Sequence, residues 1–410
     1  RPLTNGYTEH LQTMTSDKPV VKRRKPLTAW FVLATLILLV GYIWVENHYM
    51  QDSQPSIAEV QKKLNQLKLP PGFKIELYAR VPFARQLALA DNLLFVGARQ
   101  NDRVHVIVDK DRDSKADAII PIRGFKSPNG VAFKDDTLYI GEVDRILKID
   151  HISKVYGDNP RAKLYKDGLP ADTHHGWKYI RFAPDGTLFT AQGMPCNICE
   201  KEDPIYGTIL NLDKKNNWQI YASGVRNSVG FDWQPGSGDL WFTDNGRDWL
   251  GDDLPPDELN HASAPGMFFG FPYRYGNNVP DPEYGDKLHF GAKVKDANAL
   301  TAPARSLNAH VAALGMRFCN SKSFPSQYKN TVFICEHGSW NRSRPIGYRI
   351  MAVDLSQNPP TYTPFITGWQ QPDGTPWGRP VDLTFASDGS MFISDDHAGV
   401  VYRLTYQGEH

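Results

Sequence analysis

The sequence has almost no net charge and few cysteines. Its 410 residues include 46 lysines and arginines against 45 aspartates and glutamates, a formal net charge of +1. Composition therefore gives no reason to expect a nucleic-acid partner. The four cysteines are Cys196, Cys199, Cys319 and Cys335, and the first two form a lone CxxC without the second pair of a zinc site. A disulfide is the first expectation for the cysteines, free thiols the second and a metal the third.

The N-terminal part contains an uncharged run of 19 residues, Leu27–Val45, after the basic cluster KRRK at 22–25. At about 1.5 Å per residue, a helix of this length crosses the core of a bilayer. No A-x-A-like cleavage site follows it. We predict an uncleaved transmembrane signal anchor at 27–45, in preference to a cleaved signal or a buried helix. Residues 1–26 are then a basic cytoplasmic tail, in which Met14 is the expected natural start.

This orientation places residues 46–410 beyond the membrane. We therefore expect a single-pass protein of a bacterial inner membrane whose larger part lies in the periplasm. Residues 46–67 are predicted to be a linker with a short helix, because four aliphatic residues between 57 and 67 follow helical spacing. The prolines in LPPGF end that helix, and residues 68–410 form the predicted main domain.

A hairpin pattern recurs six times in the main domain, whose glycines, prolines and aromatic residues are typical of a turn-rich β-protein. A polar turn followed by an aliphatic–aromatic strand occurs in DNLLFVG, DDTLYIG, DGTLFTA, SGDLWFT, KNTVFIC and DGSMFIS. A second strand precedes most copies, a third follows several, and a fourth often ends in glycine. This recurrence predicts an all-β, six-bladed β-propeller, whereas a sandwich would need coincidental turns. One longer interval indicates an insertion at 249–305.

The loops between predicted blades return toward the central channel and carry polar residues. Guanidinium groups suit carboxylates or phosphates, and a histidine can act as a base near neutral pH. We therefore expect distant blades to build one concave site for an anionic cofactor beside a proton acceptor. Taken singly, each of these residues has a surface or packing role as its alternative. The candidates are Asn129, His174, His175, Arg226, Asn227, His310 and Arg379.

Several stretches resemble a known family. They are HHGWKYIRFAPDG, PCNIC, GVRNSVGFDW, LWFTDNGRDWLGDDLPPDELN, EHGSWNRS and GRPVDLTFASDGS. They are similar to the sorbosone/soluble glucose dehydrogenase group, and more closely to its sorbosone dehydrogenase-like branch. The resemblance covers about residues 68–406 and is most specific at 224–260. It implies a six-bladed propeller that uses pyrroloquinoline quinone (PQQ) to oxidise a sugar or a sugar-derived aldehyde, with 68–410 as the catalytic domain.

The resemblance implies a general base. His175 matches the family's histidine that takes the proton from the substrate hydroxyl as hydride moves to the quinone. The glucose enzymes have an aspartate just before this histidine, and here the position is His174. A carboxylate that orients the base is therefore missing there, and a substitute must come from elsewhere.

The resemblance also implies cofactor contacts. Arg226 and Asn227 match a pair that contacts the quinone, and Arg379 matches an arginine that binds a carboxylate. Asn245 stands where the glucose enzymes have glutamine, so its contact would be shorter. The family's lysine on the cofactor has no clear equivalent, and its first cofactor-binding glutamine is equally hard to place. The candidates for these two positions are Asn341 or Arg342 and Asn129, respectively.

Two calcium sites are expected. The resemblance implies that main-chain carbonyls of Gly246 and Arg247 hold the ion that bridges to the quinone. The stretch DKDRDSKAD has the alternating acidic residues of a calcium loop, although Ser114 stands where such loops usually have glycine. A structural calcium ion is the expectation there, and a solvated acidic hairpin is its alternative. The predicted ligands are Asp109, Asp111, Asp113 and Asp117.

The sequence thus favours a membrane-anchored quinoprotein dehydrogenase with PQQ and Ca²⁺. Its electrons would pass to a membrane quinone or a periplasmic cytochrome. A calcium-dependent, lactonase-type propeller hydrolase is the second hypothesis, and it requires acidic and asparagine ligands around a central metal. A non-catalytic propeller that binds a partner or a glycan is the third. The arginines and histidines of the channel loops favour the first, because they suit an anionic cofactor.

Overall fold

The computed structural model describes residues 54–285 and 300–408. The described residues make up one compact unit. The transmembrane anchor predicted at 27–45 and the basic tail at 1–26 fall outside the described residues. Within the two described ranges, no helix combines the length and the apolar character needed to cross a bilayer.

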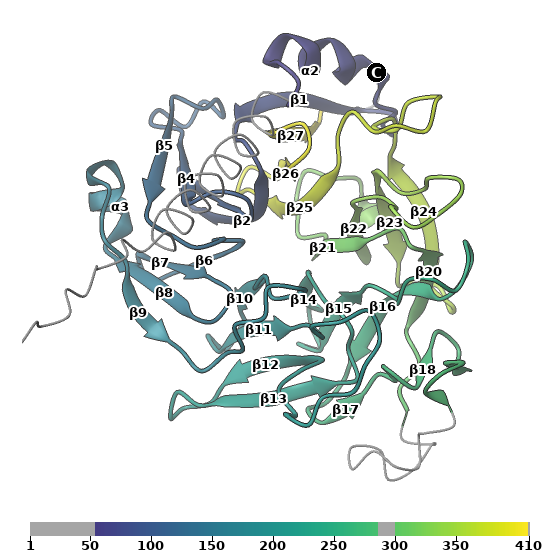
Figure 1. Cartoon of the computed structure of the whole chain (residues 1–410). Coiled ribbons are helices and arrows are strands. Elements are labelled where there is room, and N and C mark those ends of the chain that lie inside the picture. The colour runs from purple at the N-terminus through teal and green to yellow at the C-terminus, as the bar shows by residue number, and fades with distance from the viewer. Residues whose placement is uncertain (1–53, 286–299, 409–410) are drawn as a thin grey trace, which may run out of the picture. The chain divides into compact units, whose positions relative to one another are not determined.

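Six sheets of this unit stand around a common axis, which confirms the predicted six-bladed β-propeller (Figure 1). Each recurring hairpin motif contributes the second strand of its blade. The first blade consists of β2 (Ala84–Ala90), β3 (Leu93–Ala98), β4 (Arg103–Val108) and β5 (Ala118–Arg123). The second consists of β6 (Gly130–Lys134), β7 (Thr137–Gly141), β8 (Ile146–Asp150) and β9 (Lys163–Lys166). The third consists of β10 (Ile180–Phe182), β11 (Leu188–Gln192), β12 (Thr208–Leu212) and β13 (Trp218–Ser223).

The other three blades complete the ring. Neighbouring inner strands contact one another around the axis, as β21 does with β25 and β25 with β2. The fourth blade consists of β14 (Phe231–Trp233), β15 (Leu240–Asp244), β16 (Pro256–Ala262) and β20 (Arg305–Ala309). The fifth consists of β21 (Ala313–Phe318), β22 (Thr331–Glu336), β23 (Arg349–Asp354) and β24 (Thr361–Ile366). The sixth consists of β25 (Pro380–Phe385), β26 (Met391–Asp395), β27 (Val400–Tyr406) and β1 (Phe73–Arg80).

The ring is closed by strand β1, which comes from the start of the domain and pairs antiparallel with the last strand. Phe73 lies opposite Tyr406, and Arg80 lies opposite Val400. The sixth blade therefore takes three strands from one end of the described chain and one from the other. The sequence analysis assigned no strand to this segment, because FKIELYAR lacks the turn that introduces the other copies.

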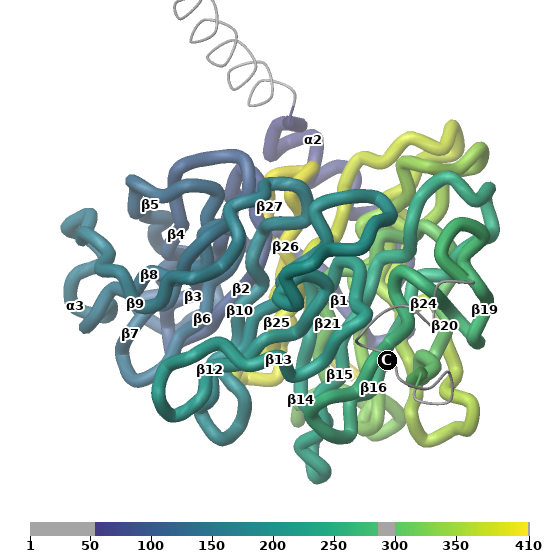
Figure 2. Tube along the Cα trace, turned by 60° about the horizontal axis from the view of Figure 1, so that its bottom comes forward, coloured from purple at the N-terminus to yellow at the C-terminus, as the bar shows by residue number. Residues whose placement is uncertain are grey.

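The short helix expected before the propeller is α2 (Ile57–Lys63), which lies beside the closing blade (Figure 2). Its N-terminus is capped by reciprocal bonds between Ser56 and Glu59. Val60 and Leu64 are buried in the same apolar cluster as Trp369. The helix is thus part of the packed unit. Another short helix, α3 (Ile152–Val155), follows β8.

The fourth blade contains the longest interruption. The segment predicted as an insertion, 249–305, includes the third strand of this blade, β16. The sequence PDELNHA was not predicted to be a strand, because buried polar side chains such as Asn260 and Glu258 stand where the other strands have aliphatic ones. The excursion that follows carries β17 (Met267–Phe268), which pairs in parallel with β13 of the third blade, and the small hairpin β18 (Arg274–Tyr275) and β19 (Val279–Pro280).

A buried polar network joins the inner strands of distant blades. Asp382 on β25 accepts hydrogen bonds from the backbone N–H of Leu87 at 2.9 Å and from the hydroxyl of Tyr179 at 3.5 Å. Arg317 on β21 pairs with the same carboxylate at 3.5 Å and also donates to Tyr179. Arg317 is 4% and Asp382 1% exposed. Burial raises the pKa of Asp382, and the guanidinium opposes that rise.

We expect Arg317→Met to lower the free energy of unfolding by about 3 kcal/mol, since it leaves the Asp382 carboxylate buried without its cation. Arg317→Met combined with Asp382→Asn should recover part of that loss, because the amide keeps a hydrogen-bond acceptor and removes the charge. Urea unfolding midpoints check both. Equal midpoints for the single variant and the parent would contradict the role of this pair.

Candidate active site

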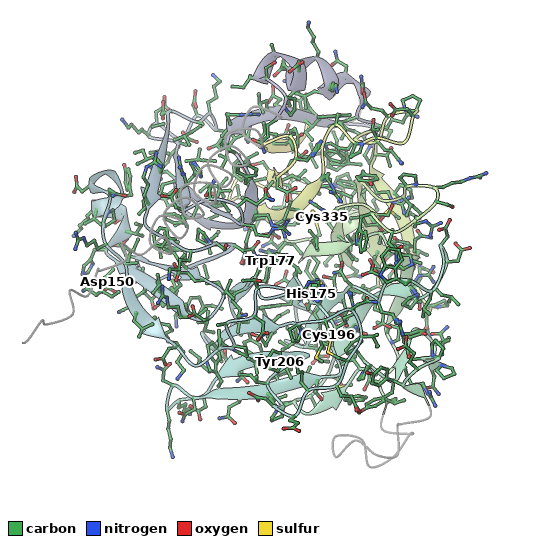
Figure 3. The ribbon with its side chains drawn as sticks, viewed as in Figure 1. Asp150, His175, Trp177, Cys196, Tyr206 and Cys335 are labelled. Carbon is green, nitrogen blue, oxygen red and sulfur yellow. A yellow bond between two sulfur atoms is a disulfide. The ribbon has the colours of Figure 1, made fainter. Side chains whose placement is uncertain are left out.

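A cavity of about 310 Å³ opens among the inner loops of the ring, where Figure 3 shows His175 and Trp177. Five of the seven channel residues predicted from the sequence line it, although they come from different blades. Two residues named from the family resemblance, Asn245 and Gly246, line it as well. The five are His174, His175, Arg226, Asn227 and His310.

The imidazole of His175 has a defined tautomer. Its Nδ1 lies 2.8 Å from the carbonyl oxygen of Met194, and a carbonyl can only accept, so Nδ1 carries the proton. Nε2 is therefore left with a lone pair. Burial, Arg226 and His174 lower the pKa of His175 to about 3, against the effect of the Met194 carbonyl. The imidazole is thus neutral at physiological pH, and its orientation comes from a backbone carbonyl in place of the missing aspartate.

The backbone at His175 is held in an unusual conformation. Its φ is +52°, a value rarely adopted by residues other than glycine. Gly193 lies against it, and a Cβ at Gly193 would come within 2.6 Å of the His175 carbonyl oxygen. A glycine is therefore required at 193 to let this turn sit against the blade.

Arg226 is held at the cavity wall by the CxxC loop. Its Nε donates to the carbonyl of Asn197 at 2.8 Å and its Nη2 to the Asn197 side chain at 3.0 Å. Asp248 lies 3.3 Å from the same Nη2. Asn197 sits between Cys196 and Cys199, which form the disulfide that was the first expectation. The expectation of a disulfide holds for this pair and not for Cys319 and Cys335, which are free and buried. The clamp that Asn197 makes was not predicted from the sequence.

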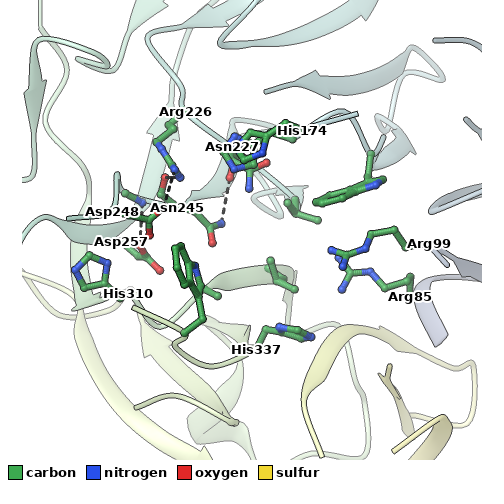
Figure 4. Close-up of a pocket in the computed structure, with 17 residues that line it drawn as sticks. Arg85, Arg99, His174, Arg226, Asn227, Asn245, Asp248, Asp257, His310 and His337 are labelled. Carbon is green, nitrogen blue, oxygen red and sulfur yellow. Dashed lines mark hydrogen bonds and ion pairs between the residues drawn. The ribbon is translucent and has the colours of Figure 1, made fainter. Parts of the chain in front are cut away.

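Two arginines that the sequence analysis did not name line the opposite side of the cavity from Arg226 (Figure 4). Arg85 pairs with Asp396 at 2.8 Å. Arg99 lies over the ring of Trp177, 4.0 Å from its centroid, and has no carboxylate partner among the described residues. Burial and Arg85 lower the pKa of Arg99 to about 10, Asp396 opposes this and Arg379 adds to it. This side of the cavity therefore holds a guanidinium without a direct carboxylate partner among the described residues.

A histidine on the same side forms a second polar pair. His337 Nε2 lies 2.7 Å from Asp396, whose carboxylate also binds Arg85. Burial raises the pKa of Asp396, but the hydrogen bond with His337 and the charge of Arg85 outweigh it and hold the pKa of Asp396 well below its usual range. Burial lowers the pKa of His337 to about 4 although Asp396 opposes it. The motif EHGSWNRS contains His337, but nothing in the sequence alone pairs it with a residue 59 positions away.

Two predicted cofactor contacts lie behind the cavity wall. Asn129 is 1% exposed and accepts a hydrogen bond from Arg85 Nε at 2.9 Å. Arg379 donates from Nε to the carbonyl of His337 at 2.9 Å and from Nη2 to that of Gly338 at 2.8 Å. Neither lines the cavity. Both support residues that do.

Two further candidates are turned to other partners. Asn341 and Arg342 do not line the cavity. Arg342 donates to the carbonyl of Asp252 and lies 3.4 Å from the carboxylate of Asp253. Its guanidinium therefore ties two loops together. Nδ2 of Asn341 is buried without a partner among the described residues.

Of the two residues predicted to offer carbonyl ligands, Gly246 lines the cavity and Arg247 does not. A Cβ at Gly246 would come within 2.8 Å of Pro255. The Arg247 side chain points elsewhere and pairs with Asp281 at 2.7 Å and with Glu283 at 2.8 Å. No described residue donates a hydrogen bond to the carbonyl oxygens of Gly246 and Arg247. Both oxygens are therefore available as ligands.

The acidic loop of the first blade gathers three of its four predicted ligands. Carboxylate oxygens of Asp109, Asp111 and Asp117 lie within 4.8 Å of one another, and Oδ1 of Asp109 is buried without a partner. Asp113 is outside this group and pairs with Lys115. Ser114 has φ +69°, the backbone conformation for which such loops usually use glycine.

Comparison with known proteins places these features in context. A family model described as TrAA12-like matches residues 210–407. An uncharacterized protein of Borreliella burgdorferi is 32% identical over 402 residues, which cover 93% of this chain and 98% of that protein. A pyrroloquinoline quinone-dependent pyranose dehydrogenase of Coprinopsis cinerea is 27% identical over 127 residues, which are 26% of this chain and 16% of that protein.

Solved structures share the fold. A Trichoderma reesei enzyme of carbohydrate-active family AA12 has a TM-score of 0.69 at 20% identity, with 83% of this chain and 97% of that chain covered. The holo PQQ domain of the Coprinopsis cinerea pyranose dehydrogenase has a TM-score of 0.66 at 16% identity, over 83% and 97%. The soluble aldose sugar dehydrogenase of Escherichia coli has a TM-score of 0.59 at 18% identity, over 82% and 99%.

The unpaired charge of Arg99 makes a measurable prediction. We expect Arg99→Met to raise the unfolding free energy of the ligand-free protein by about 1 kcal/mol, because an uncompensated cation is removed and the aliphatic stem still covers Trp177. The same variant should lose any stabilisation by a tricarboxylate such as citrate. Thermal unfolding with and without citrate checks this, with Arg112→Met as the surface control. A lower melting temperature with an intact response to citrate would contradict it.

Proposed function

We propose, from the premise that this chain belongs to the same family as the Borreliella burgdorferi protein, that it is a PQQ-dependent sugar dehydrogenase. One observation carries the proposal. A neutral imidazole with a free Nε2 and a guanidinium without a carboxylate partner line the same axial cavity. Such a cavity suits an anionic cofactor beside a base. Several proteins similar to this chain bind or depend on PQQ.

The residues present fit PQQ and a calcium ion. PQQ is a flat quinone with three carboxylates, and the unpaired Arg99 beside Arg85 supplies positive charge for them. Calcium takes oxygen ligands, and the unbonded carbonyls of Gly246 and Arg247 offer two. Asn227 lines the same wall as Gly246 and would contact the cofactor there.

When bound, PQQ supplies a two-electron acceptor for a hydride. The chain's own residues handle the proton. His175 Nε2 takes it from the reacting hydroxyl, while the Met194 carbonyl keeps Nδ1 protonated and the ring in place. Arg226 keeps the imidazole neutral through its charge, because it disfavours a second cation nearby. The Asn197 clamp fixes that guanidinium.

The carboxylates of the cavity support this proposal against a calcium-dependent hydrolase. Both oxygens of Asp257 already accept backbone N–H groups, from Gly246 at 2.9 Å and from Ala313 at 3.3 Å. Asp248 pairs with Arg226. Both carboxylates are thus engaged within the protein, whereas a lactonase-type site requires carboxylates directed at a central metal.

The proposal extends to features supported by the sequence alone. The uncharged run at 27–45 and the basic cluster before it support an anchor in a bacterial inner membrane, with the propeller in the periplasm. Electrons would then pass to a membrane quinone or a periplasmic cytochrome. The quoted motifs support a sorbosone-like or aldose substrate. The acidic trio of Asp109, Asp111 and Asp117 supports a structural calcium ion in the first blade.

Reconstitution tests the central proposal. The purified protein with PQQ and calcium should bleach a redox dye in the presence of an aldose, and His175→Ala should lower kcat by about 10²- to 10⁴-fold. PQQ affinity should change little, since the base is not a charged partner of the cofactor. His174→Ala, which removes the adjacent ring, should cost at most a few-fold. Full dye reduction by His175→Ala would refute the assignment of the base.

The pH dependence follows from the depressed pKa of His175. The imidazole is an active base only above its folded-state pKa, which is about 3. We therefore expect kcat/KM to show no acid limb near pH 6.5, where an ordinary histidine would titrate. A pH–rate profile between pH 4 and 8 measures this. An acid limb near pH 6.5 that persists in variants of the other histidines would have to arise from His175. Such a limb would contradict the neutral, buried state of His175.

A further inference from the structure

Two tryptophans stand exposed at the mouth of the cavity. Trp249 and Trp340 are each 66% exposed, the highest values among the exposed large apolar residues of the described chain. Their ring centroids lie 5.3 Å apart at an interplanar angle of 85°. Trp340 also lines the cavity. Exposed aromatic surface that continues from a cavity marks a place where a ligand rests.

The two loops that carry these tryptophans are bound to each other. Asp252, close to Trp249, accepts the backbone N–H of Ser343 at 2.9 Å, and its own carbonyl accepts from Arg342. Arg342 also pairs with Asp253 at 3.4 Å. The arginine that the sequence analysis considered as a cofactor contact therefore connects the two loops.

A cavity residue braces the first of these loops from inside. His310 Nε2 lies 2.9 Å from the carbonyls of both Gly251 and Leu254. Trp249 has φ +71°, a conformation that aromatic residues rarely adopt. Backbone strain of this kind persists only where the surroundings fix it. The backbone beneath Trp249 is thus fixed, and the two rings contact each other, which limits the side-chain entropy that a bound ligand would remove.

We propose that Trp249 and Trp340 bind a second sugar unit, so that the substrate is the terminal sugar of an oligosaccharide. This inference rests on the proposed function. A pyranose has a C–H face that packs on an aromatic ring and a hydroxyl edge that needs polar partners. The Asp253 side chain is 91% exposed beside Arg342 and supplies such a partner. The surface therefore offers both kinds of contact that a sugar ring makes.

The size of the cavity places the second unit outside it. Pockets for small molecules range from about 300 to 1,000 Å³, and this cavity of about 310 Å³ is at the lower end. A tricyclic cofactor and the reacting sugar leave no room for another ring. The next unit of a chain must then leave past Trp340, which is the tryptophan that the cavity and the pair share.

A protein partner fits this surface less well. At up to about 250 Å² for each tryptophan, the exposed parts of both rings amount to roughly 300 Å², whereas a stable interface buries about 800 Å² per partner. A single sugar ring matches the smaller area. An electron-accepting protein is therefore an outcome of the test and not the expected occupant.

The test compares substrate lengths on the reconstituted full-length protein. Glucose is measured against malto- and cello-oligosaccharides of two and three units, by kcat/KM with a dye acceptor. We expect Trp249→Ala to lower the ratio of trisaccharide to glucose roughly tenfold, as loss of one aromatic contact does. Trp249→Phe should restore the ratio. Leu254→Ala, an exposed apolar residue of the same loop, should leave it unchanged.

A ratio that does not depend on length in the parent, or that Trp249→Ala leaves unchanged, overturns the inference. The inference is also overturned if Trp340→Ala loses PQQ affinity to the same extent as it loses trisaccharide turnover, because Trp340 would then bind the cofactor. So does a Trp249→Ala variant that is slowed only with a cytochrome acceptor, since this would identify a protein-docking surface.

A second measurement does not depend on the proposed function. The same oligosaccharides should quench tryptophan fluorescence of the protein without PQQ, and Trp249→Ala should remove most of that quenching. If PQQ fails to bind and the quenching persists, the proposed function fails and the sugar site stands. If PQQ-dependent oxidation proceeds and no oligosaccharide of the panel quenches, the sugar site fails alone.

Discussion

The structure depends on the carboxylate of Asp382, which receives partners from three other blades near the propeller axis. Leu87 and Tyr179 donate hydrogen bonds to it, and Arg317 neutralises it. Leu87 lies two residues along β2 from Arg85, which lines the cavity. The network and the cavity wall are therefore connected through the same inner strand, β2. A buried carboxylate with this many partners holds the blades in one register, because each lost partner leaves a charge unsatisfied.

The cavity wall contains one guanidinium that is engaged within the protein and one that is not. Arg226 is surrounded by Asn197 and Asp248, so its donors are largely used within the protein. Arg99 is stacked on Trp177 and unpaired. A ligand carboxylate therefore gains most at Arg99, whereas Arg226 acts mainly on the neighbouring imidazole of His175. An anionic cofactor and a neutral base can then share one small cavity without competing for the same guanidinium.

The repeated hairpin was readable from the sequence because turn and strand are local signals. Ring closure was not, since β1 meets β27 across the whole domain. The residues of the site divide in the same way, into those that lie in sequence motifs and those that meet only in the folded structure. His175, Arg226 and Asn245 lie in motifs, and the structure brings them together. Arg99 follows the end of β3 and lies outside any quoted motif, and Asp396 and His337 meet only in the folded structure. Arg342 carries the right charge but uses it between loops.

Unfavourable backbone conformations gather around this cavity. His175, His310, Ala312 and Trp249 all have positive φ, and the first three line the cavity. Such conformations cost about 1–3 kcal/mol each and persist only when surrounding contacts determine them. Here those contacts come from segments far apart in the sequence: His310, which follows β20, bonds to the 251–254 loop between β15 and β16. His175, which precedes β10, likewise lies 2.8 Å from the carbonyl of Met194, which follows β11. The geometry of the site is therefore a property of the folded blades and not of the motifs that supply its residues.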